Sequence, residues 1–354
     1  MLKRLRTIPL VYPALFFLVM GMNPFIAFAK DITDRRDAGH SGANVLHLEE
    51  YQTAEGLLIT FRNGGVADPY FGLYSLELAR RAGMDVRQTA LSFIRWGLKN
   101  QRSDGRFGRY CQQEGRWQYC GRADSDDATL ARWLQLLVNT SDGYPLPPAW
   151  QASFDQALKV LMSLRMKNGI YSVFPPDTPG YAGYALFKDN VEVLNALENL
   201  ARYFHAAGDG LRARQFAQDA RALRQAIGKQ FGQNIFALRA LALNARYEKP
   251  LFYPHAVAIP FAWMEGFGPR PSRADAARWL KEYEEGWLEM ARTDYPWGLM
   301  ALALMDAGDT KRAVRWLEDN RYWRQKGEHW NILEETSAQI IHYRLQSQAG
   351  GLNS

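Results

Sequence analysis

The chain has 354 residues, of which 47% are hydrophobic and 13% aromatic, and its formal net charge is +6. Three of the basic residues, Lys3, Arg4 and Arg6, belong to the N-terminus, so the rest of the chain beyond residue 29 carries a charge of only +3. Such a weak positive charge argues against a nucleic-acid partner.

Residues 1–29 have the three parts of a secretory signal peptide. A basic start is followed by an apolar run over residues 8–28, which ends in the small-x-small sequence Ala-Phe-Ala at residues 27–29. An uncleaved anchor is the alternative, although three prolines in the run disfavour a spanning helix. We expect cleavage after Ala29, a periplasmic or secreted protein, and a single domain over residues 30–354, because no linker or low-complexity segment divides it.

The chain holds two cysteines, Cys111 and Cys120, which lie close together in the sequence. In an oxidising compartment they would most simply form a local disulfide. Two cysteines make no metal site, and the six histidines do not cluster at ligand spacing. The sequence therefore predicts no metal and no cofactor.

Helical periodicity and capping signals recur along the chain. We expect helices over residues 44–61, 70–82, 85–99, 126–137, 150–166, 189–204, 209–230, 255–263, 273–290, 299–307, 310–318 and 332–345. Residues 101–123 are expected to form a long loop, and residues 234–245 have a helical pattern without a clear place in the fold.

The connections between these helices are of two kinds. Tight turns occur at Gly83, Gly208-Asp209 and Gly308-Asp309, whereas the alternate connections are mostly long and aromatic. Short turns on one side and long loops on the other predict an all-α (α/α)6 toroid, with six inner helices ringed by six outer ones. The six inner helices would start at Tyr70, Asp126, Asp189, His255, Trp297 and Ile332. A helical-repeat solenoid is disfavoured because the tight turns do not follow a 34-residue period.

An acidic cluster opens one of the inner helices. Asp124, Asp126 and Asp127 precede a face of apolar residues with helical spacing, so the three carboxylates lie on the first turn of a buried helix. Asp124 and Asp127 can be explained as a cap and its reciprocal partner. Asp126 is not needed for that capping, and three acids this close raise the pKa of at least one, so Asp126 is the first catalytic candidate.

The starts of the inner helices would bring acids and aromatic side chains to one concave face. Glycoside hydrolysis needs one protonated acid, one base and surfaces that stack on sugar rings. The structural alternatives are that Asp68, Asp124 and Asp189 are helix caps, that His255 is a rim histidine, and that Trp297 and Trp330 belong to the core. The predicted loop 101–123 adds five arginines among aromatic residues, which would suit an anionic sugar such as a uronate or simply be solvated.

Two segments resemble known families. The sequence Gln-Arg-Ser-Asp-Gly-Arg-Phe-Gly at 101–108 resembles the glutamine-aspartate-glycine repeat of squalene-cyclase and prenyltransferase-like toroids. Residues 124–127, Asp-Ser-Asp-Asp, resemble the Asp-x-Asp-Asp motif of the cyclases, which implies a proton donor at Asp126. Ala128-Thr129 departs from that motif, and export to an aqueous compartment argues against a terpene substrate.

The acidic helix, the tyrosine-rich segment 70–74 and the helix count also resemble the six-hairpin glycosidases, including glycoside hydrolase family eight, and the α/α-toroid polysaccharide lyases. The resemblance to family eight implies an inverting endo-acting hydrolase with a glutamate acid and an aspartate base. The corresponding helix start here offers only Asp68.

Together these observations predict an exported inverting glycoside hydrolase that acts on a polysaccharide or oligosaccharide. Asp126 would be one carboxylate and Asp68 or Glu335 the other, about 6.5 to 9.5 Å apart, with Asp127 as a further catalytic candidate. The candidate substrate-binding residues are Tyr70, Asp124, Arg109, Trp117, Asp189, His255, Trp297 and Trp330. The alternatives are a uronate-polymer lyase with a tyrosine or His255 as base, and a non-catalytic saccharide-binding component of envelope polysaccharide production.

Overall fold

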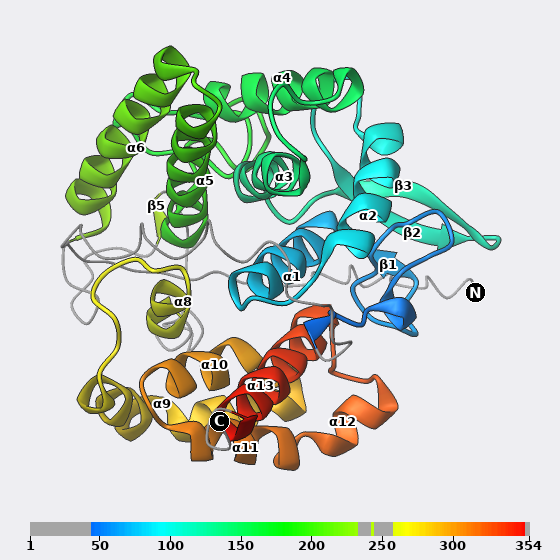
Figure 1. The fold of residues 1–354 in the computed structure, drawn as a ribbon, viewed down its shortest axis with the longest axis vertical. Helices are drawn as coiled ribbons and strands as arrows, with labels where there is room; N and C mark the ends of the chain where they lie inside the picture. Colours follow the sequence, from blue (N-terminus) through cyan, green and yellow to red (C-terminus); the bar gives the residue numbers. More distant parts are fainter. Residues whose placement is uncertain (1–43, 233–241, 244–257, 351–354) are drawn as a thin grey trace, which may run out of the picture.

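The computed structural model of the chain describes residues 44–232, 242–243 and 258–350. This part is mainly α-helical, as the sequence predicts (Figure 1). The helices are α1 (Pro69–Arg81), α2 (Arg87–Asn100), α3 (Asp126–Thr140), α4 (Pro148–Ser163), α5 (Phe187–Ala206), α6 (Gly210–Phe231), α8 (Ala258–Met264), α9 (Arg273–Thr293), α10 (Gly298–Asp306), α11 (Thr310–Asp319), α12 (Arg321–Lys326) and α13 (Ile332–Gly350).

Six of these helices contact one another in a closed cycle. α1 packs on α3, α3 on α5, α5 on α8, α8 on α10, α10 on α13, and α13 returns to α1. Other helices lie outside the cycle: α2 and α4 pack on α3, α6 packs on α5, and α11 packs on α10 and α13 (Figure 1). Within the cycle, α3 and α5 follow long connections, whereas α10 and α13 follow short ones.

The apolar face of α3 is packed tightly against its neighbours. Leu130, Trp133, Leu134 and Leu137 are all buried, in agreement with the helical spacing of the sequence. Gly97 of α2 lies directly over Trp133, and a Cβ atom there would come within 2.4 Å of the indole ring. Close packing of this kind leaves no room for even one methyl group, so α2 can approach α3 only through this glycine.

The predicted tight turns are confirmed. Gly83, Gly208 and Gly308 have φ values of 86°, 76° and 91°, in the left-handed region that favours glycine after a helix. Asp209 and Asp309 each follow their glycine and cap the next helix, because each side chain accepts a hydrogen bond from the backbone NH three residues later.

The predicted helix over residues 44–61 is wrong. Only a short 3₁₀ turn, η2 (Glu49–Tyr51), forms there. Leu46, Leu48 and Tyr51 are buried, but they reach the core from an extended path that is tied to its neighbours by backbone bonds, such as the one from Leu46 N to Asp85 O (2.9 Å). The spacing of these apolar residues was compatible with a helix, and tertiary contacts favoured another conformation.

The predicted loop over residues 101–123 instead contains a β-hairpin. Strands β2 (Gly108–Gln113) and β3 (Arg116–Arg122) pair antiparallel, and β1 (Val66–Ala67) adds a third strand beside β2. A separate short pair is formed by β4 (Ala185–Leu186) and β5 (Ala242–Leu243). The predicted disulfide between Cys111 and Cys120 is confirmed and joins the two long strands (Cα–Cα 5.6 Å).

The disulfide should contribute measurably to stability. It closes a loop with a sequence separation of 9 residues, for which loop-closure entropy gives about 2 to 3 kcal/mol. We therefore expect the double variant Cys111→Ser/Cys120→Ser to lose that much free energy of unfolding in urea denaturation. Wild-type protein treated with a reductant is the matched control and should unfold at the same urea concentration as the variant. Equal stability of the oxidised wild type and the variant would contradict this expectation.

Across the described residues, none of the helices combines the length and the apolar character needed to cross a membrane. The expected signal peptide, residues 1–29, lies outside the described residues. So does most of the segment 234–245, whose helical pattern had no clear place in the sequence analysis.

Candidate active site

The starts of α1, α3 and α5 bring together four aspartates, which we call the acid cluster: Asp68, Asp124, Asp127 and Asp189. The backbone NH of Asp124 donates to Asp68 Oδ2 (2.9 Å), which joins the start of α1 to the segment before α3. Asp127 and Asp189 are within hydrogen-bonding reach of each other, which joins α3 to α5. The sequence predicted this convergence because these helices begin on the same side of the fold.

Asp68 both caps α1 and carries a perturbed carboxyl group. Its Oδ1 accepts a hydrogen bond from Tyr70 N, and its Oδ2 accepts two from the Arg109 guanidinium, each of 3.2 Å. Burial, and then the nearby charge of Asp124, raise the pKa of Asp68 to about 7, although Arg109 opposes the shift. The pKa of Asp68 is therefore raised even though its carboxyl oxygens accept four hydrogen bonds.

Asp126 is buried on the first turn of α3. Its backbone NH donates to Val173 O (2.9 Å), and its Oδ2 accepts a bond from Arg106 (3.3 Å). Burial raises the pKa of this carboxyl to about 6, and Arg106 holds it below the value that burial alone would give. The cap of α3 is Ser125, so Asp126 is not used for capping, as the sequence indicated.

The expected reciprocal capping by Asp124 and Asp127 is not formed. Asp127 Oδ1 accepts a bond from Ala128 N, and Asp124 precedes the capping residue Ser125. Asp124 is partly exposed. Burial raises its pKa above the usual value, and Lys188 and Arg109 only partly oppose this rise. Asp124 therefore lies between the buried acids and the solvent.

Asp127 and Asp189 form a buried carboxyl pair. The Oδ2 atoms of both residues are buried and have no other hydrogen-bond donor. Burial raises the pKa of Asp127 well above its usual value and that of Asp189 to about 7. A proton held by Asp127 can satisfy both carboxyl groups, because a protonated acid donates a hydrogen bond. Asp189 is not the cap of α5, which begins at Phe187.

Tyr70, on the first turn of α1, connects the acid cluster to Lys188 and Glu192 of α5. Its hydroxyl donates to Glu192 Oε1 (2.8 Å) and accepts a hydrogen bond from Lys188. The Lys188 ammonium lies 4.3 Å from the centre of the Tyr70 ring and 3.7 Å from Glu192 Oε2. The positive charge of Lys188 therefore opposes the rise in the pKa values of Asp124 and Asp189.

An ion network whose centre, Arg132 with Glu192 and Glu265, is buried supports this arrangement. The Arg132 guanidinium of α3 lies 2.7 Å from Glu192 of α5 and 2.9 Å from Glu265, which directly follows α8. Arg81 of α1 also pairs with Glu265 (2.9 Å), and Arg132 stacks on the Tyr74 ring at 3.8 Å. The network thus fixes four members of the helix cycle relative to one another.

The segment before α10 faces the acid cluster. The charge of Asp124 helps to raise the pKa of Tyr295, after burial and the neighbouring Asp294, so the tyrosine lies within electrostatic reach of the cluster. Trp297 follows with a φ of 52°, a strained conformation for a bulky residue. Glu334 of α13 holds this turn through a hydrogen bond from Gly298 N (2.6 Å). The expected aromatic residue Trp297 is partly exposed at this turn, and its ring contacts that of Tyr295.

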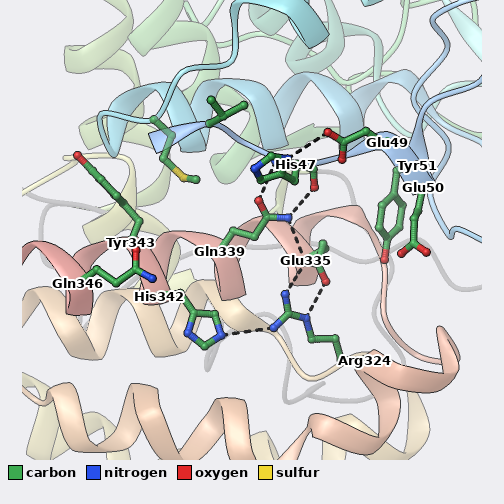
Figure 2. Close-up of a pocket in the computed structure, with 12 residues that line it drawn as sticks. His47, Glu49, Glu50, Tyr51, Arg324, Glu335, Gln339, His342, Tyr343 and Gln346 are labelled. Atoms are coloured by element: carbon green, nitrogen blue, oxygen red, sulfur yellow. Dashed lines mark hydrogen bonds and ion pairs between the residues drawn. The ribbon is translucent and has the colours of Figure 1, made fainter. Parts of the chain in front are cut away.

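Glu335 lies elsewhere, in a pocket of about 460 Å³ along α13 (Figure 2). Arg324 binds both of its carboxylate oxygens (2.6 and 2.9 Å), and the Trp330 indole and Gln339 donate to it as well. These partners outweigh burial and lower the pKa of Glu335. Trp330 is buried in the core, stacked on Trp316 at 5.3 Å, which agrees with the structural alternative.

Of the remaining candidate substrate-binding residues that the structure describes, only Arg109 contacts the acid cluster directly. Arg109 of β2 reaches Asp68, whereas Trp117 of β3 is partly buried against the core. His255 lies outside the described residues. In the described ranges, no group of three or more His, Cys, Asp or Glu side chains is placed to hold a metal ion.

Sequence analysis missed Lys188, Arg132 and Tyr295. Only Lys188 left a usable signal, because it precedes Asp189 and is four residues before Glu192 on one helix face. Arg132 gave none, since an arginine among the apolar residues of α3 does not reveal which acids from other helices it meets.

No protein-family model matches the chain, and no curated protein matches it. Solved structures do resemble it. One, described as a glycosidase, is 14% identical, with 84% of this chain and 92% of that one covered and a TM-score of 0.53. Another, described as a novel alpha-amylase from Clostridium perfringens, is 8% identical, with coverage of 84% and 95% and a TM-score of 0.54. The chain therefore has a glycosidase-like fold.

Proposed function

We propose that the protein is an exported (α/α)6 toroid that hydrolyses glycosidic bonds of a polysaccharide or oligosaccharide with inversion. The closed cycle of six helices, with further helices outside it, supports the toroid over residues 30–354. The glycosidase-like fold supports the substrate class as an analogy. The observation that carries the proposal is chemical: two buried carboxyl groups with raised pKa values, Asp68 and Asp126, lie at the starts of neighbouring helices.

The two pKa values support a division of roles. Asp68, with the higher pKa of about 7, is the general acid that gives its proton to the glycosidic oxygen as the bond to the anomeric carbon breaks. Asp126, with a pKa of about 6, is the general base that takes a proton from the attacking water. The water adds to the opposite face of the sugar, which inverts the anomeric configuration.

Three alternatives receive less support. Glu335 is a poor second carboxylate because Arg324 occupies both of its oxygens, in a pocket that neither Asp68 nor Asp126 lines. A lyase receives less support because the two arginines that contact the candidate carboxyl groups, Arg106 and Arg109, are already paired with Asp126 and Asp68. Asp127 serves better as a proton-bearing partner of Asp189 than as a catalyst.

The test is to measure products from a panel of neutral and acidic polysaccharides, with the chain from Lys30 onward and its Asp126→Asn variant. We expect reducing ends without ultraviolet absorbance, an inverted anomer by NMR, and a loss of at least about 100-fold in the variant. Asp142→Asn is the matched control because Asp142 is an exposed aspartate that pairs with Arg87.

Three results would contradict the proposal. Unsaturated, ultraviolet-absorbing products would indicate a lyase. Full activity in Asp126→Asn would remove Asp126 from the mechanism. Saccharide binding without any cleavage, by folded protein, would indicate the non-catalytic role in envelope polysaccharide production.

A further inference from the structure

We propose that Arg122 forms a subsite that binds the carboxylate of a uronic acid residue in the polysaccharide. The inference rests on the proposed hydrolase function and adds the substrate class. It is carried by the position of Arg122 beside Asp126, by its aromatic support, and by its lack of a carboxylate partner among the described residues.

Arg122 is the last residue of β3 and is exposed, but two aromatic rings hold its guanidinium group. Its Cζ atom lies 4.9 Å from the centre of the Phe174 ring and 5.3 Å from that of Tyr181. The two rings meet edge to face at 4.9 Å, and Tyr184 packs on Tyr181 at 5.9 Å. The guanidinium is therefore positioned before any ligand binds, which reduces the entropy that binding costs.

The same loop is tied to the first turn of α3. Val173, next to Phe174, accepts the backbone NH of Asp126 (2.9 Å) and donates its own NH to Tyr184 O (2.8 Å). The charge of Arg122 also acts on the Asp126 carboxyl group. A sugar residue bound at Arg122 would thus lie next to the proposed general base.

Other arginines of the same region are already neutralised. Arg102 and Arg106 both pair with Asp104, Arg106 also reaches Asp126, and Arg109 pairs with Asp68. Within residues 44–232, 242–243 and 258–350, Arg122 has no such ion pair, and its contacts are to ring faces. An arginine whose face is stacked keeps the edge of its fork free for an acceptor.

The free edge of a guanidinium matches one chemical group closely. It presents parallel NH donors that bind a planar carboxylate through two hydrogen bonds, whereas a neutral sugar hydroxyl can use only one. A uronic acid carries such a carboxylate on its ring. The geometry therefore favours an acidic polysaccharide over its neutral counterpart.

The test compares a uronic-acid polymer with the same polymer after chemical reduction of its carboxyl groups to primary alcohols. We expect wild-type protein to prefer the acidic form and Arg122→Gln to reduce that preference, as the ratio of kcat/KM values, by about 10- to 100-fold. Arg122→Lys keeps the positive charge but lacks the two parallel NH donors, so it should restore little of the preference for the acidic polymer. Arg116→Gln is the matched control, an exposed arginine of the same strand, and should keep the wild-type ratio.

The outcomes separate this inference from the proposed function. Hydrolysis with a ratio that Arg122→Gln leaves unchanged, or a wild-type preference for the reduced polymer, would overturn the subsite and leave the hydrolase standing. Absence of cleavage on every polymer would overturn the hydrolase. Affinity electrophoresis in gels that contain either polymer then decides the subsite: equal retardation of wild type and Arg122→Gln by the acidic polymer would overturn it.

Discussion

Asp68→Asn is expected to lower kcat/KM on a natural polysaccharide by about 10² to 10⁴-fold, the usual contribution of a general acid. Asparagine can still accept the hydrogen bond from Tyr70 N and cap α1, but its NH2 group cannot accept the bonds that Arg109 and Asp124 N donate to Oδ2, so circular dichroism must check that the variant keeps its fold. The loss should be much smaller on an aryl glycoside whose leaving group departs without a proton. This difference distinguishes a general acid from a residue that only supports the structure.

The pH dependence of the wild type should be bell-shaped. The acid must be protonated, so activity falls as pH rises through the pKa of Asp68, about 7. The base must be ionised, so activity falls as pH drops through the pKa of Asp126, about 6. Profiles of kcat/KM should therefore peak between these values, and Asp68→Asn should lose the alkaline limb. A variant that keeps both limbs would exclude Asp68 as the acid.

Arg132→Met is expected to destabilise the fold by about 3 to 5 kcal/mol, because it leaves buried carboxylates without their main cation. Glu192 and Glu265 are almost fully buried on either side of Arg132. Urea unfolding at pH 7 measures the loss. Arg95→Met is the matched control, since Arg95 is exposed on α2 and should change stability by less than about 0.5 kcal/mol.

The effect of Arg132→Met should also depend on pH. In the wild type, burial raises the pKa of Glu265, but Arg132 and Arg81 outweigh it and hold the pKa well below its usual range. A depressed folded-state pKa stabilises the fold above the unfolded value, near 4.5, and this stability is lost as pH falls. Without Arg132 the carboxylate can be protonated more easily, so the difference between variant and wild type should shrink from pH 7 to pH 4. A constant difference would contradict the role assigned to the ion network.

The sequence predicted the start of a helix well where a glycine turn is followed by a capping aspartate. The turns at Gly208-Asp209 and Gly308-Asp309 combine a residue that accepts positive φ with one that caps the next helix, and both helices begin where expected. Residues 44–61 lacked such signals. Their apolar spacing fitted a helix, yet burial against α1 and α13 requires an extended path, which only the complete fold reveals.

The hairpin and the electrostatics of the site were harder to foresee. Strands β2 and β3 are rich in Gly, Gln and Arg and contain no Val, Ile or Thr, so Tyr110, Trp117 and Tyr119 gave only a weak strand signal. Asp126 could be named as a catalytic candidate because it was not needed for capping, which is a local argument. The pairing of Asp127 with Asp189, and of Arg132 with Glu265, joins residues far apart in sequence, which no pattern within one helix encodes.

The closed helix cycle has a consequence for biosynthesis. α13 completes it by packing on α1, and Gln339 of α13 bonds both the NH and the carbonyl of His47. A nascent chain therefore cannot cover the α13-facing side of α1 until α13 has left the ribosome. Partly made chains expose apolar surface until α13 is in place. Synthesis is therefore the period in which this protein most needs a chaperone to prevent aggregation.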